Sequence, residues 1–296
     1  MKKKKLLSIV LSAAMVFSMS AVGAFAADGD ATTSYTSEDG ITLIGAAPFA
    51  GATNVAPGSN NAPQPVRVAL DGSVSTVVAN INDSDKTNDY IKVTTEVTDD
   101  AGATVTEQLN VTASADGNIV VLTPVTGTRM ESGTDYEVEF SGILTGISGY
   151  SFRTSQGGTG SGGGSGTGGG GGNQQLTLTG QIPFGEMAAD GTTVASAMTV
   201  SAGQDLYAVF SNSLLPGTQN NSGIDDLKGH NLNQISITDA SGNAVTCTVD
   251  ITDSWTIKVD TEGLSAGSYR LVISDDLTAN NGKTYAGKTI PFNIAA

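Results

Sequence analysis

The chain has 296 residues, of which 15% are charged and 5% are aromatic, and its formal net charge at pH 7 is −15. A strongly acidic surface repels nucleic acid and anionic lipid, so neither is expected as a partner. With one histidine and one cysteine, the chain excludes an intramolecular disulfide and a zinc site built from several His or Cys ligands.

Residues 1–26 have the three parts of a secretory signal peptide. Lys2–Lys5 form the basic region, an apolar run follows, and Ala24–Ala26 is an A-x-A cleavage site. Serines interrupt the apolar run, which is short for a membrane-spanning helix of about 20 apolar residues. Cleavage removes four lysines and no acidic residue, so the formal charge changes from −15 to −19. We therefore expect a secreted, extracellular protein, associated with the cell surface without membrane insertion of the mature chain.

Composition divides the mature chain into two domains and two linkers. A polar, acidic linker over 27–40 precedes a first domain over 41–156. The stretch 157–175 is dominated by glycine and cannot bury apolar surface, so we expect a flexible linker there. A second domain follows over 176–296. The linker predicts that the two domains reorient almost independently.

Both domains are predicted to be all-β. Short runs rich in Val, Ile, Thr and Tyr alternate apolar and polar residues with a period of two, and glycine- and aspartate-rich turns separate them. No segment outside the signal peptide shows a sustained helical period. The spacing of the strands predicts a β-sandwich in each domain. The clearest strands are 66–70, 136–140, 235–237, 255–259 and 269–273.

The two domains are predicted to be copies of one another. The phrase Thr-Leu-Ile-Gly-Ala-Ala-Pro-Phe at 42–49 returns as Thr-Leu-Thr-Gly-Gln-Ile-Pro-Phe at 177–184. The strand–turn–strand segment 98–105 corresponds in order and character to 238–245. Each copy then has a strand that begins with a Gly-x-Tyr or Gly-Thr-x-Tyr turn and a closing strand that contains phenylalanine. A shared order of this kind indicates a duplication.

Three motifs of the first domain carry a family resemblance. They are Pro48–Val55, the Ser-Gly-Thr-Asp-Tyr-Glu-Val strand at 132–138, and Phe-Arg-Thr at 152–154. Together they resemble the bacterial Ig-like domain family of S-layer and other surface proteins. The resemblance covers about 45–155, and the second domain shares it at Leu264–Tyr269. It implies two tandem Ig-like β-sandwich domains in a surface setting, but no chemistry. By position, Tyr136 and Tyr269 are expected to be packing or corner residues of the sandwich.

No catalytic, cofactor-binding or metal-binding residue is predicted. His230 is expected in a loop, and Cys247 is expected as a small buried residue on one face of a strand at 245–251, so no nucleophile–base pair forms. Trp255 is expected on an inward strand face, which leaves no aromatic platform for a sugar. The acidic pairs at 99–100, 225–226 and 275–276 are interpreted as exposed turns rather than as paired catalytic carboxylates.

Calcium is the one cofactor that stays open. The segment 80–89 concentrates Asn, Asp and Ser oxygens, and calcium takes about 6–8 oxygen ligands. The segment lacks the ligand spacing and the distal glutamate of an EF-hand, so a solvated loop between strands is the preferred interpretation.

These observations predict a secreted, non-catalytic protein with a structural or adhesive role at the cell envelope or in the extracellular matrix, where its partner is a polymer or another protein. Two alternatives remain. The chain could be a filament subunit that self-associates when the polar segment 28–41 adds a strand to a neighbour. It could also be a carbohydrate-binding accessory module. The two copies differ most in the loops 78–91 and 213–233, where we expect any binding surface.

Overall fold

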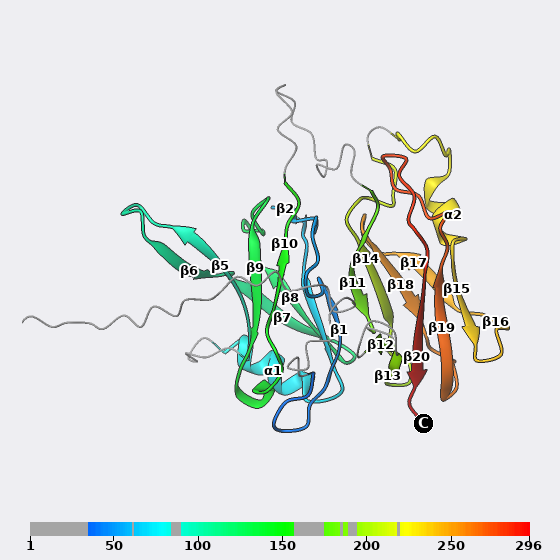
Figure 1. The fold of residues 1–296 in the computed structure, drawn as a ribbon, viewed down its shortest axis with the longest axis horizontal. Coiled ribbons are helices and arrows are strands. Elements are labelled where there is room, and N and C mark those ends of the chain that lie inside the picture. The colour runs from blue at the N-terminus through cyan, green and yellow to red at the C-terminus, as the bar shows by residue number, and fades with distance from the viewer. Residues whose placement is uncertain are drawn as a thin grey trace, which may run out of the picture.

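The chain forms two β-rich modules, here called module 1 (35–156) and module 2 (175–296) (Figure 1). The structure is a computed structural model that describes residues 35–60, 62–83, 90–156, 175–183, 186–188, 194–217 and 220–296, with only the backbone given for 186–188 and 194–198. Nearly all its regular elements are strands, which confirms the all-β prediction. The predicted signal peptide and the glycine tract lie outside the described residues.

Module 1 is a sandwich of two antiparallel four-stranded sheets whose inward side chains form one core. In strand β9, buried Tyr136 and Val138 alternate with exposed acidic residues, as expected for a sheet with one face in the core. The first sheet contains, in order, β1 (Leu43–Ala47), β4 (Val66–Leu70), β8 (Ile119–Pro124) and β7 (Val111–Asp116). The second contains β10 (Tyr150–Arg153), β9 (Asp135–Phe140), β5 (Ile91–Thr98) and β6 (Thr104–Gln108), and a small ribbon pairs β2 (Gly58–Ser59) with β3 (Ala62–Pro63).

Module 2 repeats this arrangement. Its first sheet contains, in order, β11 (Leu178–Ile182), β14 (Leu206–Phe210), β18 (Thr256–Asp260) and β17 (Thr248–Ile251). Its second sheet contains β12 (Glu186–Ala188), β13 (Val194–Val200), β20 (Lys288–Ile294), β19 (Gly267–Ile273), β15 (Ile235–Asp239) and β16 (Ala244–Val245).

The strand order of each module is that of an Ig-like sandwich. Taken in chain order as A, B, C, C′, D, E, F and G, the main strands form an A-B-E-D sheet and a G-F-C-C′ sheet in both modules. In each, the segment after the first strand also pairs in parallel with the closing strand, through the Val55–Thr154 bridge in module 1 and through β13 and β20 in module 2. The Ig-like topology and the internal duplication are therefore both present in the structure.

The equivalent C–C′ turns show why the repeated acidic segments are turns. The Oδ1 atom of Asp99 accepts hydrogen bonds from the backbone N–H groups of Ala101 and Ala103, at 2.9 and 2.8 Å. Asp239 makes the same pair of bonds in module 2, both at 2.9 Å. A glycine with positive φ follows in each turn. These local bonds are typical of Asx turns.

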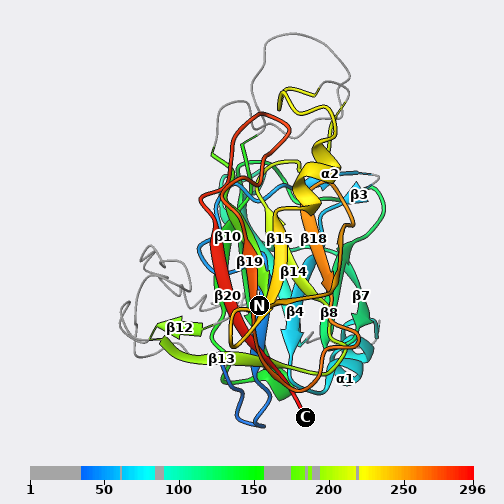
Figure 2. The same cartoon turned by 90° about the vertical axis from the view of Figure 1, so that its right-hand side faces the viewer.

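Two short helices lie at opposite ends of the molecule, one between the B and C strands of each module (Figures 1 and 2). They are α1 (Val74–Ile81) and α2 (Leu227–Leu232), and a 3₁₀ turn, η1, covers Gly142–Leu144. The sequence shows no sustained helical period at these places, because one or two turns are too short to produce one. No helix in the described part of the chain is long and apolar enough to cross a membrane.

The two modules share one continuous sheet of eight strands, in the order β17-β18-β14-β11-β1-β4-β8-β7. The equivalent strands β1 and β11 meet antiparallel, with Ala46 opposite Gln181, so the two modules are related by an approximate two-fold axis. A Cβ atom on Gly180 would lie 2.3 Å from Cβ of Ala47, and one on Gly45 would lie 2.8 Å from Cα of Ile182. The glycine of the repeated phrase therefore lets the two strands approach.

The first sheets of the two modules are joined edge to edge at β1 and β11, and they also lie face to face. The molecule is therefore a stack of four sheet layers, with the two first sheets in the middle (Figure 1). Ile44, Ala69 and Ile119 are buried on the face of module 1's first sheet that points away from its own core, and they belong to the apolar cluster of module 2. Side chains packed in this way hold the modules together. The prediction that the modules reorient independently is therefore wrong for the described residues.

We predict that Gly180→Ala destabilises the molecule by about 1–3 kcal/mol, because an added methyl group would overlap β1 backbone and force a shift. Thermal unfolding followed by circular dichroism measures the effect. Gly72→Ala is the matched control, since a Cβ there has no neighbour within 4 Å. Equal melting temperatures for the two variants would contradict the role of Gly180 in the junction.

Candidate functional site

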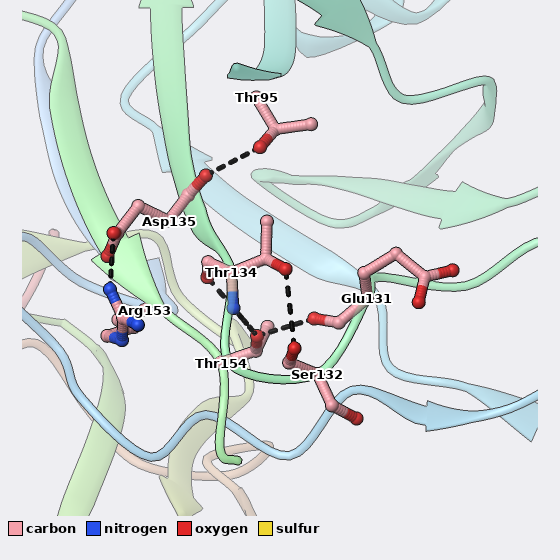
Figure 3. A network of polar contacts seen from close by, with 7 residues as sticks. All are labelled: Thr95, Glu131, Ser132, Thr134, Asp135, Arg153 and Thr154. Atoms are coloured by element: carbon pink, nitrogen blue, oxygen red, sulfur yellow. Dashed lines mark hydrogen bonds and ion pairs between the residues drawn. The ribbon is translucent and has the colours of Figure 1, made fainter. Parts of the chain in front are cut away.

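The motif residues that carry the family resemblance hold together a corner of module 1 (Figure 3). The Thr154 hydroxyl donates to the carbonyl of Glu131 at 2.5 Å and accepts from the backbone N–H of Thr134 at 2.9 Å. Beside them, Arg153 forms an exposed ion pair with Asp135. These contacts connect the F strand, β9, to the closing strand, β10, so the motif residues are used for architecture.

Tyr136 and Tyr269 are the corner residues that their positions predicted. Tyr136 stacks on the phenylalanine of β10 with ring centroids 5.6 Å apart, and Tyr269 stacks on the phenylalanine of β20 at 5.7 Å. The hydroxyl of Tyr136 accepts from the N–H of Glu131 at 2.7 Å, whereas that of Tyr269 donates to the carbonyl of Ser265 at 2.9 Å. Bonds from an F-strand tyrosine to upstream backbone are the tyrosine corner of Ig sandwiches.

A cluster of charged and polar side chains lies between the first sheets of the two modules, and we call it the seam cluster. At its centre is Arg67 of β4, whose side chain is only 12% exposed. Its guanidinium lies 3.9 Å from the Asp253 carboxylate and 5.4 Å from the centroid of the Tyr207 ring. The other members are Asp116, Asp205 and Lys258.

Burial changes the acid–base properties of this cluster. It lowers the pKa of Arg67, although the nearby Asp253, Tyr207 and Asp116 oppose this change. Burial also raises the pKa of Tyr207, and the hydrogen bond from its hydroxyl to Asp116, 2.5 Å long, raises it further. The Arg67 Nη1 atom is buried and has no hydrogen-bond partner among the described residues. The guanidinium is therefore stabilised mainly by opposite charge and by the aromatic ring.

Neutral side chains extend the seam beyond the ion pair. The Gln204 side chain accepts from the backbone N–H of Asn118 at 2.8 Å, and the Asn118 amide donates to the Ser201 hydroxyl at 2.5 Å. Both bonds cross from module 1 to module 2. Gly117 has φ +56°, and a Cβ atom there would lie 3.1 Å from the side-chain Oε1 atom of Gln204. The D–E turn of module 1 is thus fitted to module 2.

The seam cluster was not found in the sequence, although a signal was present. All five residues of β1 and all five of β14 are buried, so these strands have apolar residues on both faces rather than alternating. Continuous apolar strands are typical of sheets that are covered on both sides. Such a pattern indicates a second packing surface for each first sheet. The contacts of the seam cluster hold the two modules together.

The proposed calcium segment is partly committed to structure. The Asn80 side chain is buried and accepts from the backbone N–H of Tyr90 at 2.9 Å. The Asn82 side-chain amide donates a hydrogen bond to the carbonyl of Ala113 at 2.7 Å and accepts one from the N–H of Ala113 at 2.8 Å. Residues 84–89 lie outside the described part, as does part of 213–233. Within the described residues, no three His, Cys, Asp or Glu side chains come together as metal ligands.

Three sequence expectations need correction. His230 lies in helix α2, not in a loop, because Asp226 caps that helix by accepting from the N–H of Gly229 at 2.9 Å. Cys247 lies between β16 and β17 rather than within one strand, since the chain changes sheets there; it is half-buried, and burial raises its thiol pKa. Trp255 precedes β18 and is half-buried instead of facing the core. The acidic pairs are exposed, as predicted.

No protein-family profile and no curated protein matches the chain. Among solved structures, the titin Ig tandem A164–A165 is 12% identical, covering 85% of this chain and 98% of its own, with a TM-score of 0.22. A Bacteroides ovatus mixed-linkage glucan utilisation protein, solved with a heptasaccharide, is 15% identical over 81% of this chain and 42% of its own, at 0.20. The N-terminal part of the S-layer protein SbsC is 10% identical over 83% and 43%, at 0.21. Similarities with TM-scores this low do not establish a family or a function for this chain.

We predict that Asp253→Asn destabilises the molecule more than Arg67→Met does. The asparagine keeps the acceptor for the N–H of Trp255, at 2.8 Å, but leaves the buried guanidinium without its nearest counter-charge. We expect a loss of about 1–3 kcal/mol for Asp253→Asn in urea unfolding, and less for the methionine variant. The opposite order would contradict the view that the buried guanidinium depends on Asp253 as its counter-charge.

Alkaline pH should weaken the seam. Because the folded pKa of Tyr207 lies above its unfolded value of about 10, its contribution to stability is complete below pH 10 and is lost as the pH rises further. The free energy of unfolding of the Tyr207→Phe variant should therefore fall less between pH 9 and pH 11 than that of the unchanged protein. Parallel pH curves for the two proteins would contradict this.

Proposed function

We propose that the mature chain is a secreted, non-catalytic protein with a structural or adhesive role at the cell envelope or in the extracellular matrix. The observation that carries this proposal is the packing of the two first sheets against each other (Figure 1). This packing leaves the second sheet of each module facing outward, on opposite sides of one body. Such a body can contact two partners, or two parts of one polymer, at a set distance.

The two outward faces differ in charge. In module 1, β9 exposes Asp135, Glu137 and Glu139, and Glu96 lies on the neighbouring strand. Partial burial and then the charges of Glu139 and Glu96 raise the pKa of Glu137. In module 2, the exposed residues of β19 include Ser268 and Arg270. The faces are therefore suited to different parts of a partner, so the duplication provides two contacts rather than one repeated contact.

Bivalent contact explains how weak faces could hold the protein at a surface. When one face is bound, the second meets its partner at a high effective concentration. The seam supports this mechanism, because a fixed spacing avoids the entropy lost when a flexible pair binds twice.

The two earlier alternatives are affected differently. A carbohydrate-binding accessory module remains a separate alternative to the structural or adhesive role. In the alternative of strand addition by the segment 28–41, residues 35–41 cannot pair with a neighbour. The backbone N–H of Ser37 donates to the carbonyl of Ile41 at 2.8 Å, and that of Leu43 donates to the carbonyl of Tyr35 at 2.7 Å. These bonds tie residues 35–41 to their own module.

Co-sedimentation of the mature chain with isolated cell-envelope polymer tests the proposal. We expect retention at physiological salt, and a loss of affinity of about tenfold for either Glu137→Lys or Arg270→Glu, because each removes one of two linked contacts. Glu262→Lys changes an exposed turn and is the control. Absence of retention of the unchanged protein would refute the envelope role, and a signal confined to a glycan array would identify the accessory module instead.

A further inference from the structure

Most long strand edges of module 1 are covered by the chain itself. The edge of β10 pairs with the segment after β1: Arg153 donates to the carbonyl of Ala52 at 2.8 Å, and Val55 donates to that of Arg153 at 3.1 Å. The edge of β7 is closed by the side chain of Asn82, which bonds the carbonyl and the N–H of Ala113. Covering of this kind prevents a foreign strand from pairing.

Strand β6 is different, because all five of its residues are exposed. It pairs with β5 on one side only and forms the end of its sheet within the described residues. The β5–β6 hairpin projects from the sandwich (Figure 1). Its sequence, Thr-Val-Thr-Glu-Gln, contains no lysine or proline, and its pairing with β5 has no bulge, so Glu107 is the one charged residue that protects this edge.

The register shows which backbone groups of β6 point outward. Asp99 donates to the carbonyl of Ala103 at 2.8 Å, and Leu109 donates to that of Val93 at 2.8 Å. Hydrogen-bonded and non-hydrogen-bonded pairs alternate in an antiparallel ladder. The intervening pairs then direct the backbone groups of Val105 and Glu107 toward β5, and those of Thr104 and Thr106 toward the open edge.

We propose that β6 pairs antiparallel with β6 of a second copy of this chain, about a two-fold axis at Thr106. Each Thr106 then exchanges two backbone hydrogen bonds with its counterpart. On the other face, Val105 lies opposite Glu107 of the second copy, so no carboxylate directly faces another carboxylate. The self-complementary register argues for a second copy as the occupant.

Because a two-fold contact uses the same strand on both chains, it closes at two subunits. The equivalent strand of module 2, β16, has only two residues and offers no comparable edge. The product is therefore a discrete dimer and not a filament. The ladder is much smaller than a standard interface of about 1,600 Å², so the dimer forms at high concentration, such as on a crowded surface. It would double the number of outward faces. Its biological value rests on the proposed envelope role, whereas its existence does not.

Sedimentation velocity of the mature chain over a concentration series tests the dimer. We expect reversible dimers that are favoured by added salt, because screening weakens repulsion between two acidic chains. Thr106→Pro removes the outward N–H donor without touching the pairing with β5, and should abolish the dimer, whereas Thr106→Ala should retain it. An unchanged melting temperature shows that the proline variant is folded.

Two charge variants test the register itself. Val105→Glu places like charges opposite each other at both symmetry-related positions and should weaken the dimer about fivefold or more, whereas Val105→Lys should strengthen it by a similar factor. A monomer at every concentration, equal effects of the two charge variants, or loss of the dimer on removal of residues 27–34 alone would overturn the proposal. None of these outcomes depends on envelope binding, which the co-sedimentation assay measures separately.

Discussion

Strands β1 and β11 approach each other at a distance that only glycine allows, and the arrangement of the two modules depends on this contact. Gly45 and Gly180 occupy equivalent positions in the repeated phrase, and each leaves room for the backbone of the other copy. The strands meet antiparallel, so the first sheets continue into one another at this edge. The same two sheets also pack against each other through the faces that point away from their own cores. The phrase that marks the duplication in the sequence is thus also the surface through which the duplicated modules contact each other.

Packing two sheet faces together requires that their polar groups be satisfied. Apolar side chains such as Ile44 and Ile119 fill part of this contact, but Arg67 brings a charge into it, and a buried charge is costly unless it is paired. Asp253 and the ring of Tyr207 come from the other module, so assembly of the modules supplies the nearest groups that compensate the charge. The guanidinium therefore favours one arrangement of the modules over others that would bury the same apolar area.

Duplication has conserved the sandwich while allowing the edges and outer faces to diverge. Both copies keep the Asx turn, the corner tyrosine and the stacked phenylalanine, because these contacts are local to each module. The C′ strand is five residues long in module 1 and two in module 2. The outer faces also differ in charge. These differences affect which surfaces are available to partners and leave the core of each module unchanged.

The sequence by itself determined the all-β class, the duplication, the positions of most strands, the acidic turns and the corner tyrosines. These features depend on alternation and on bonds between residues close in the chain, which a local pattern records. The short helices were missed because one or two turns show no period in the sequence. The half-buried position of Trp255 and the chain's change of sheet at Cys247 were missed because one or two residues decide them. Only the tertiary structure decided that the first sheets meet. That contact joins residues far apart in the chain, such as Arg67 and Asp253, and its energy depends on the complementarity of two assembled faces, which no local pattern contains.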